Sequence, residues 1–168
     1  HDGESWLNTE WFFAEAYLYR LIVGAVDWHT TGVDPFVAKK EEEVTGGGIQ
    51  AAIRHALTAP PDTRLANLLH HALWGNRVDL SYAIGTTHGV ATSDDLLADD
   101  SAAVIDYLQA SEPGHVHIVL DNAGTELAMD ILFVDALLDI VDRVTLHVKD
   151  HPTFVSDATR GDVLDFLS

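Results

Sequence analysis

The chain has 168 residues, of which 47% are hydrophobic, and its 27 acidic side chains outnumber nine Lys and Arg, giving a formal net charge of −18 at pH 7. This composition is typical of a folded globular protein with one sizeable core. The negative charge argues against nucleic-acid binding and against attachment to an anionic membrane, since both need clustered basic side chains.

Cysteine is absent, so the chain can form neither disulfides nor thiolate metal sites. No window approaches the roughly 18 consecutive apolar residues of a transmembrane helix, and no segment resembles a signal peptide. We therefore predict a cytoplasmic protein without membrane association.

Residues 1–112 are expected to form a helical cap. Ser5 is the expected N-cap of its first helix, and Asp34 before Pro35 is expected to cap another. The run of glycines at 46–48 predicts a flexible break. From the spacing of apolar residues, the expected helices cover about residues 5–28, 34–43, 49–57, 63–74 and 93–110. The four tryptophans are expected in the core of this cap: Trp6, Trp11, Trp28 and Trp74.

Residues 113–168 change period and predict the first part of an α/β domain. A short apolar strand at 116–120 is followed by a helix at 125–141, an alternating strand at 143–149 and a second helix from 160. This order indicates a βαβ unit with parallel strands, and hence a Rossmann-like, three-layer domain under the helical cap.

The predicted sheet is too small to be complete. Parallel sheets are buried on both faces, and two strands with one helix between them cannot exclude water from both sides. The apolar helix at 127–141 is also expected to need more cover than this chain supplies. We therefore expect a fragment of a larger domain, with further strands and phosphate-binding basic residues after Ser168, in the same chain or as a separate segment.

Polar side chains follow both predicted strands. Asp121 and Asn122 come directly after the first strand, and Asp157 lies in the loop after the second. Parallel strands lie about 5 Å apart and end at the same sheet edge, so these loops are expected to converge. Two carboxylates and a carboxamide form an all-oxygen ligand set suited to Mg²⁺ or Mn²⁺. The N-terminus of the following helix is a favourable place for a phosphate.

Other polar residues near this edge allow two interpretations each. Glu126 either contacts substrate or a metal-bound water, or complements the dipole of its helix. Asp130 lies near it on the helical wheel and is expected to be buried or nearly so. Asn76 and Asp79 either line the cleft or cap local turns, and Arg77 either meets a phosphate or forms a surface ion pair.

Five sequence blocks in the same order resemble the metal-dependent damage-control phosphatases, a family once described as a domain of unknown function. The similarity is to the branch of acidic-residue methyltransferase-like proteins, and it covers nearly the whole chain. The blocks are SWLNTEWFFAEAYLYRLI, DPFVAKKEEE, LWGNRVDLS, IVLDNAGTELAMDILFVDALL and KDHPTFVSDAT.

The resemblance implies that Asp121, Asn122 and Asp157 bind a divalent metal (Mn²⁺, Co²⁺, Ni²⁺ or Mg²⁺) and act in catalysis. It implies substrate contacts for Asp121, Asn122 and Glu126, and Asn76 is a further candidate. The implied reaction is hydrolysis of sugar phosphates such as fructose 1-phosphate or fructose 6-phosphate. The family's C-terminal Arg-Thr-x-Lys motif has no match here.

We therefore expect a metal-dependent phosphatase that acts on a small phosphorylated metabolite. Two attacking groups stay open: a metal-bound water, or Asp121 through a phospho-aspartate. Two other functions also stay open. One is S-adenosylmethionine-dependent methyl transfer to protein carboxylates, and the other is a binding module without activity.

Overall fold

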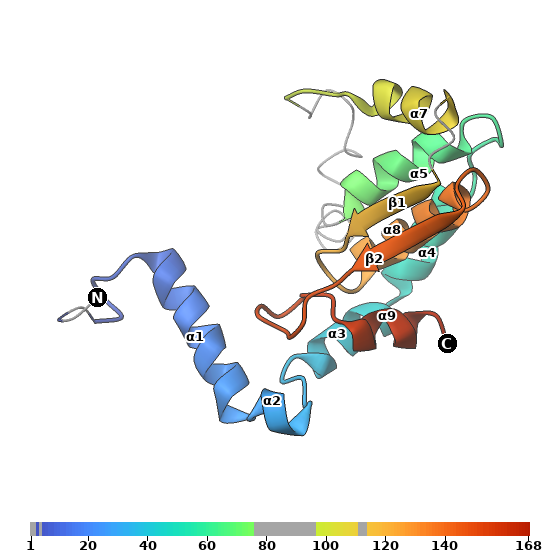
Figure 1. Cartoon of the computed structure of the whole chain (residues 1–168). Helices are drawn as coiled ribbons and strands as arrows, with labels where there is room; N and C mark the ends of the chain where they lie inside the picture. The colour runs from blue at the N-terminus through green and yellow to red at the C-terminus, as the bar shows by residue number, and fades with distance from the viewer. Residues whose placement is uncertain (1–2, 4, 76–96, 111–113) are drawn as a thin grey trace.

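The computed structural model describes residues 3, 5–75, 97–110 and 114–168 (Figure 1). Asn76, Arg77 and Asp79 lie outside the described residues. The helices are α1 (Trp11–Ala25), α2 (Trp28–Thr31), α3 (Val37–Thr45), α4 (Gly47–Ala56), α5 (Arg64–Leu73), α7 (Ser101–Ala110), α8 (Thr125–Leu137) and α9 (Arg160–Phe166), and the strands are β1 (His115–Val119) and β2 (Arg143–His147).

The two strands form a parallel sheet connected by α8, as the sequence predicts. Their register runs from His115 opposite Arg143 to Val119 opposite His147. The described chain is therefore an α/β protein with a partial sheet, preceded by helices. The division at residues 112 and 113 stays a prediction.

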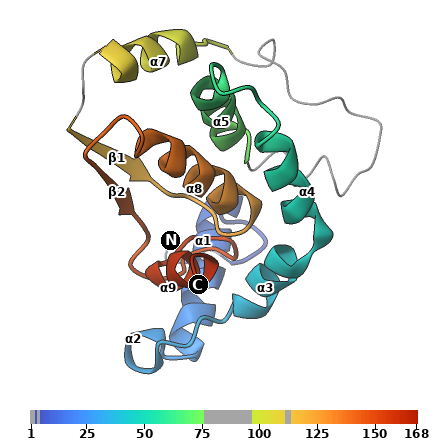
Figure 2. The same cartoon turned by 90° about the vertical axis from the view of Figure 1, so that its right-hand side faces the viewer.

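One face of the sheet packs on α8. Side chains of β1 and β2 that point to this face join two apolar clusters with α8, and α4 and α5 lie on the far side of the same helix (Figure 2). The expectation that α8 lacks cover within this chain was therefore wrong. Apolar residues of α4 and α5 supply that cover, since Ala52, Ala56 and Leu68 are buried against it.

The other face of the sheet is open. It carries three histidines, and Val119 on the same face is 79% exposed. His117 Nδ1 lies 2.8 Å from His147 Nε2, and His115 Nε2 lies 2.7 Å from the Thr145 hydroxyl oxygen. Within the described residues, no helix covers this face (Figures 1 and 2). The third layer expected of a Rossmann-like domain is therefore not seen in this part of the chain.

The first two helices form an arm that projects from the body (Figure 1). Trp6 is 56% and Trp11 74% exposed, so placing these two tryptophans in the core was wrong. The reason is that α1 is rich in apolar side chains but buries only Val23, since little of the body packs against it. Tyr19, just past the middle of α1, makes edge-on ring contacts with Phe36 and Phe154.

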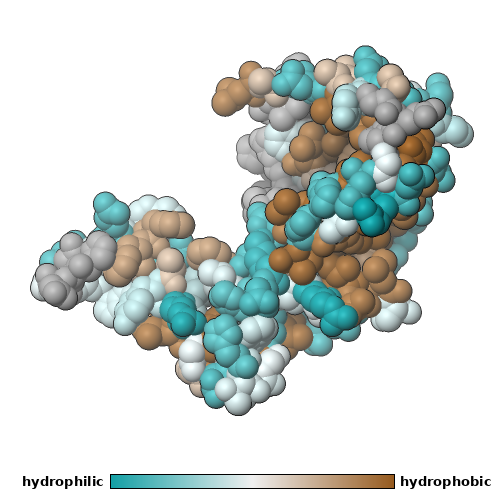
Figure 3. Space-filling view, in the orientation of Figure 1, coloured by the Kyte–Doolittle hydropathy of each residue, from teal (hydrophilic) through white to brown (hydrophobic). Residues whose placement is uncertain are grey.

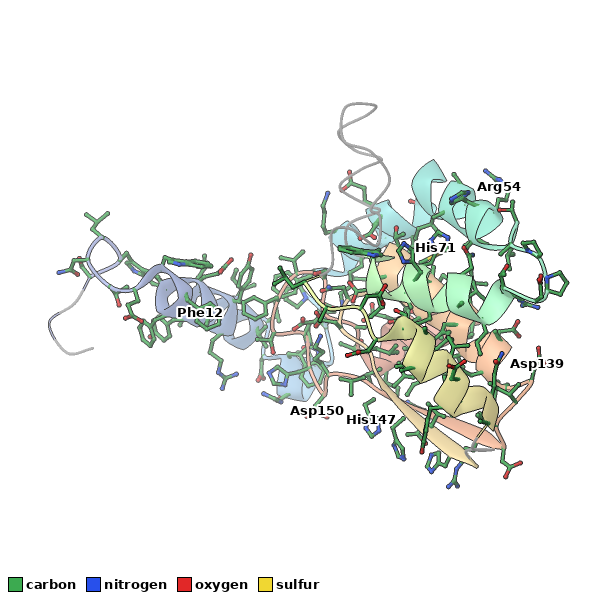
Figure 4. All side chains as sticks on the ribbon, turned by 90° about the horizontal axis from the view of Figure 1, so that it is seen from above. Phe12, Arg54, His71, Asp139, His147 and Asp150 are labelled. Carbon is green, nitrogen blue, oxygen red and sulfur yellow. The ribbon has the colours of Figure 1, made fainter. Side chains whose placement is uncertain are left out.

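The surface view agrees with this arrangement. Apolar residues reach the surface on the arm as well as on the body (Figure 3). Seen from above, Phe12 lies on the arm, well away from His147 and Asp150 near the sheet (Figure 4).

Several helix boundaries differ from the expected ones. Helix α1 begins at Trp11, because the Ser5 amide donates to the Asn8 side chain in a separate turn (2.6 Å). Asp34 accepts from the Phe36 amide (2.8 Å), as a cap would, and α3 follows at Val37. The glycines are not a break: Gly46 alone separates α3 from α4, which begins at Gly47. Among the described residues, no helix has the length and apolar character needed to cross a membrane.

Candidate functional site

The loops after the two strands meet at one edge of the sheet. The backbone of Asn122 pairs with that of Asp157 in an isolated antiparallel bridge. On either side of this bridge, the Ala123 amide donates to the Ser156 carbonyl (2.6 Å), and the Ala158 amide donates to the Asp121 carbonyl (2.9 Å). The structure thus brings Asp121, Asn122 and Asp157 together, as the strand order predicts.

Asp157 is held firmly by its own loop. Its side chain is buried, and Oδ2 accepts hydrogen bonds from the backbone amides of Thr153 (3.0 Å) and Phe154 (2.9 Å). The other oxygen, Oδ1, lies 3.4 Å from the Lys149 ammonium. One oxygen of this carboxylate is therefore fixed by the backbone, and the other faces a positive charge.

Asp121 sits in a more open position. Its side chain is 67% exposed, and Oδ1 pairs with Lys149, whose ammonium also contacts the Asp121 carbonyl. Lys149 therefore bridges the two carboxylates. A positive charge already occupies the place between them, which is where the sequence predicts a divalent cation.

Asn122 links the two loops to the first turn of α8. Its Oδ1 accepts from the Ser156 hydroxyl (2.8 Å), and its Nδ2 donates to Glu126 Oε2 (2.8 Å). A carboxamide oxygen has two lone pairs, so Oδ1 can still accept a second partner.

Glu126 lies half-buried beside this network. Burial raises the pKa of its carboxyl, the nearby charges of Asp121 and Glu43 act in the same direction, and the Asn122 hydrogen bond opposes them. Gly75, which follows α5 after Trp74, fits against Glu126 so closely that a Cβ at Gly75 would lie 2.7 Å from the Glu126 Cα. The position of Glu126 at the site edge is thus fixed from two sides.

The N-terminus of α8 differs from expectation. The Thr125 amide donates to the Glu43 carboxylate at 2.7 Å, so the place expected for a phosphate holds a side chain of α3. Gly124 has φ +82°, and a Cβ there would collide with this carboxylate. Sequence reasoning missed Glu43, because it is 82 residues from Thr125. The glycine before the helix is the one local signal of a close approach.

Asp130, one turn further along α8, completes a group of acids. Burial raises the pKa of its carboxyl to about 7, and the charges of Glu126 and Asp121 contribute. Repulsion among these carboxylates disfavours their charged forms unless a cation lies nearby. Such perturbed carboxyls gather preferentially at functional sites.

The donor chemistry of this edge fits a hard divalent cation. Asp121, Asn122 and Asp157 offer oxygen atoms alone, which Mg²⁺ and Mn²⁺ prefer. Within the described ranges, no cluster of three or more His, Cys, Asp or Glu side chains is arranged to hold a metal. The set at this edge is of another kind, since it has two such carboxylates and a carboxamide. Asn76, the remaining substrate-binding candidate, lies outside the described residues.

Known proteins are similar to this chain over most of its length. The family model of the damage-control phosphatase ARMT1-like domain matches residues 4–168. Curated proteins named damage-control phosphatase ARMT1 are similar over most of the chain. That of Rattus norvegicus is 32% identical over 96% of this chain and 44% of its own length. That of Danio rerio is 31% identical (94% and 43%), and that of Homo sapiens 30% identical (96% and 44%). The chain thus spans less than half the length of these relatives.

Proposed function

Since the chain belongs to the damage-control phosphatase ARMT1-like domain family, we propose that it acts as a metal-dependent phosphatase on small phosphorylated metabolites. The observation that carries this proposal is the meeting of Asp121, Asn122 and Asp157 at one sheet edge. The proposed substrates are phosphate monoesters of sugars or of related damaged metabolites, of the fructose 1-phosphate and fructose 6-phosphate type.

In this proposal, Asp121, Asn122 and Asp157 hold the metal, which is Mn²⁺, Co²⁺, Ni²⁺ or Mg²⁺. When bound, a divalent cation polarises a phosphoryl oxygen and offsets the charge that develops on it. Such an offset matters here, because a chain of net charge −18 repels a phosphate ester.

The chain's own residues supply orientation and charge. Asp157 is held by two backbone amides, so it presents the same oxygen before and after substrate arrives. The Lys149 ammonium can turn from these carboxylates toward a phosphate oxygen, since its side chain is 29% exposed. Glu126 stands on the substrate side, where its half-buried carboxyl group can form a hydrogen bond with a sugar hydroxyl.

Asp121 has either of two roles in this scheme. Its exposed carboxylate would hold the metal while water attacks phosphorus and the sugar alcohol leaves. Alternatively, the carboxylate itself would attack phosphorus and displace the sugar alcohol, and water would then hydrolyse the phospho-aspartate to release phosphate. Trapping with a substrate that carries a radiolabelled phosphate distinguishes the two roles, since the label stays on the protein only if a phospho-aspartate forms.

Phosphate release from a panel of sugar phosphates, with and without each metal, tests the function. We expect release only with metal, and loss of release in Asp121→Asn, which keeps the shape of the side chain but removes its charge. Asp139→Asn is the matched control, because this exposed acid lies beyond the end of α8 (Figure 4). Strong residual activity in Asp121→Asn would contradict both roles of Asp121.

Calorimetry separates the phosphatase from the other two functions. Tight binding of S-adenosylmethionine without metal would favour the methyltransferase. Metal binding without hydrolysis of any phosphate ester would favour the binding module. The phosphatase predicts a clear metal isotherm and weak or no binding of the methyl donor.

The open face of the sheet indicates which partner this chain needs. Parallel strands are normally covered on both faces, and the relatives are more than twice as long as the matched part. We propose that further strands and basic residues of the same protein, continuous or as a separate segment, cover this face. A location in the cytoplasm stays part of this proposal.

A further inference from the structure

Helix α3 is attached to both of the loops that form the candidate site. The ammonium of Lys40, which is buried, lies 2.8 Å from Asp34 Oδ2 and 2.8 Å from Asp162 Oδ2. Asp162 also closes the capping box of α9, the helix that directly follows the Asp157 loop. This ion pair therefore ties α3 to the segment that carries Asp157.

Glu43 lies three residues after Lys40, on the same face of α3. Its carboxylate accepts from the Thr125 amide (2.7 Å), directly after the turn that carries Asp121 and Asn122. The turn leaves room for it, because Gly124 has no side chain and a φ of +82°. One face of one helix thus contacts the segments of all three predicted ligands.

We propose that Glu43 is a positioning residue for the metal ligands, an inference that rests on the proposed metal site. Its hydrogen bond fixes the start of α8, and hence the turn in which Asp121 and Asn122 face Asp157. Residues that hold ligands from outside the first coordination sphere typically change metal affinity by about 10- to 100-fold when they are replaced.

A second reading is that Glu43 simply caps α8. A neutral acceptor such as Ser, Thr or Asn serves that purpose, whereas a carboxylate here adds charge to a site that already holds Asp121, Glu126 and Asp130. Added negative charge is unfavourable in the absence of a cation and favourable in its presence. The choice of an acid therefore points to metal binding rather than to stability.

Calorimetric titration of the 168-residue chain with Mn²⁺ tests the inference through three variants. Glu43→Gln keeps the acceptor oxygen and its reach but loses the charge, so we expect a loss of affinity that is smaller than in the other two variants. Glu43→Asp keeps the charge but is too short to reach Thr125, and Glu43→Ala removes both. We expect these two variants to bind Mn²⁺ about 10- to 100-fold more weakly. Glu42→Ala is the matched control, because this acid on α3 is exposed, pairs with Lys39 and should bind normally.

Thermal unfolding without metal is measured on the same variants. Weak Mn²⁺ binding by a variant that melts like the unchanged chain supports positioning. Two results would overturn the inference and leave the proposed function intact. One is equal Mn²⁺ affinity in Glu43→Asp and the unchanged chain. The other is a loss of affinity in Glu43→Gln as large as that in Glu43→Ala. If the unchanged chain does not bind Mn²⁺, both the metal site and the inference fail.

Discussion

The two loops of the candidate site hold their carboxylates in different ways. Asp157 is 5% exposed and bound by two amides of its own loop, whereas the Asp121 side chain is 67% exposed and pairs with Lys149. The first is preorganised by backbone within four residues, and the second depends on Lys149, a side chain from the segment after the other strand. In the proposed metal site, the Asp157 half is therefore built before any cation binds, and the Asp121 half can adjust to one.

Asp157→Ala should have the largest effect, because it removes a proposed metal ligand and a structural acceptor together. We expect loss of metal-dependent hydrolysis and a fall in the free energy of unfolding of about 1–3 kcal/mol, since two amides lose their partner. The measurements are phosphate release and urea unfolding. Asp157→Asn keeps an acceptor and should lose activity with less loss of stability. Unchanged activity in either variant would rule out Asp157 as a ligand.

Asp121→Asn should separate activity from stability. We expect activity and metal affinity to fall sharply while the urea midpoint stays nearly constant, because an exposed ion pair contributes only about 0–1 kcal/mol. Calorimetry with Mn²⁺ and urea unfolding measure the two effects. A large loss of stability would show that Asp121 stabilises the fold as much as Asp157 does, and would contradict the difference between the two loops.

Lys149→Met tests the charge that joins the loops. Without the ammonium, Asp121 and Asp157 repel each other, so the metal-free chain should melt at a lower temperature. Mn²⁺ no longer has to displace a cation, and it should raise the melting temperature by more than in the unchanged chain. Thermal unfolding with and without Mn²⁺ measures both shifts. A smaller shift in the variant would show that Lys149 assists metal binding instead of competing with it.

Asp130, on the Asp121 side of the site, should make the free energy of unfolding depend on pH. Its pKa is about 7 in the folded chain, against an ordinary value of 3.8. The folded state keeps this proton where the unfolded state has lost it, so the stabilisation is complete below about pH 4 and is lost as the pH rises through 7.

Asp130→Asn, which resembles the protonated carboxyl, should remove this dependence. We therefore expect the variant to melt higher than the unchanged chain at pH 8 and nearly equally at pH 4. Melting temperatures across this range measure the effect. A parallel pH profile for both chains would show that Asp130 is not the group responsible.

Much of the fold follows from local patterns in the sequence. The apolar strand before Asp121 and the alternating strand before Lys149 are found where expected, and the parallel pairing follows from the helix between them. The exposed tryptophans show where such reasoning fails. Trp6 and Trp11 are of a residue type common in cores, but burial depends on whether another element packs on them. The ring contacts of α1 with Phe36 and Phe154 are made by Tyr19 instead.

By itself, the sequence determined the class of fold, the order of its elements and the meeting of Asp121, Asn122 and Asp157. All three depend on neighbours along the chain and on the rule that parallel strands end at one edge. Only the tertiary structure decided that α4 and α5 cover α8, that Lys149 lies between the two carboxylates and that Glu43 holds the start of α8. The physical reason is that these contacts join distant segments, up to 82 residues apart for Glu43 and Thr125. Their partners are fixed by how whole elements pack, which no local pattern encodes.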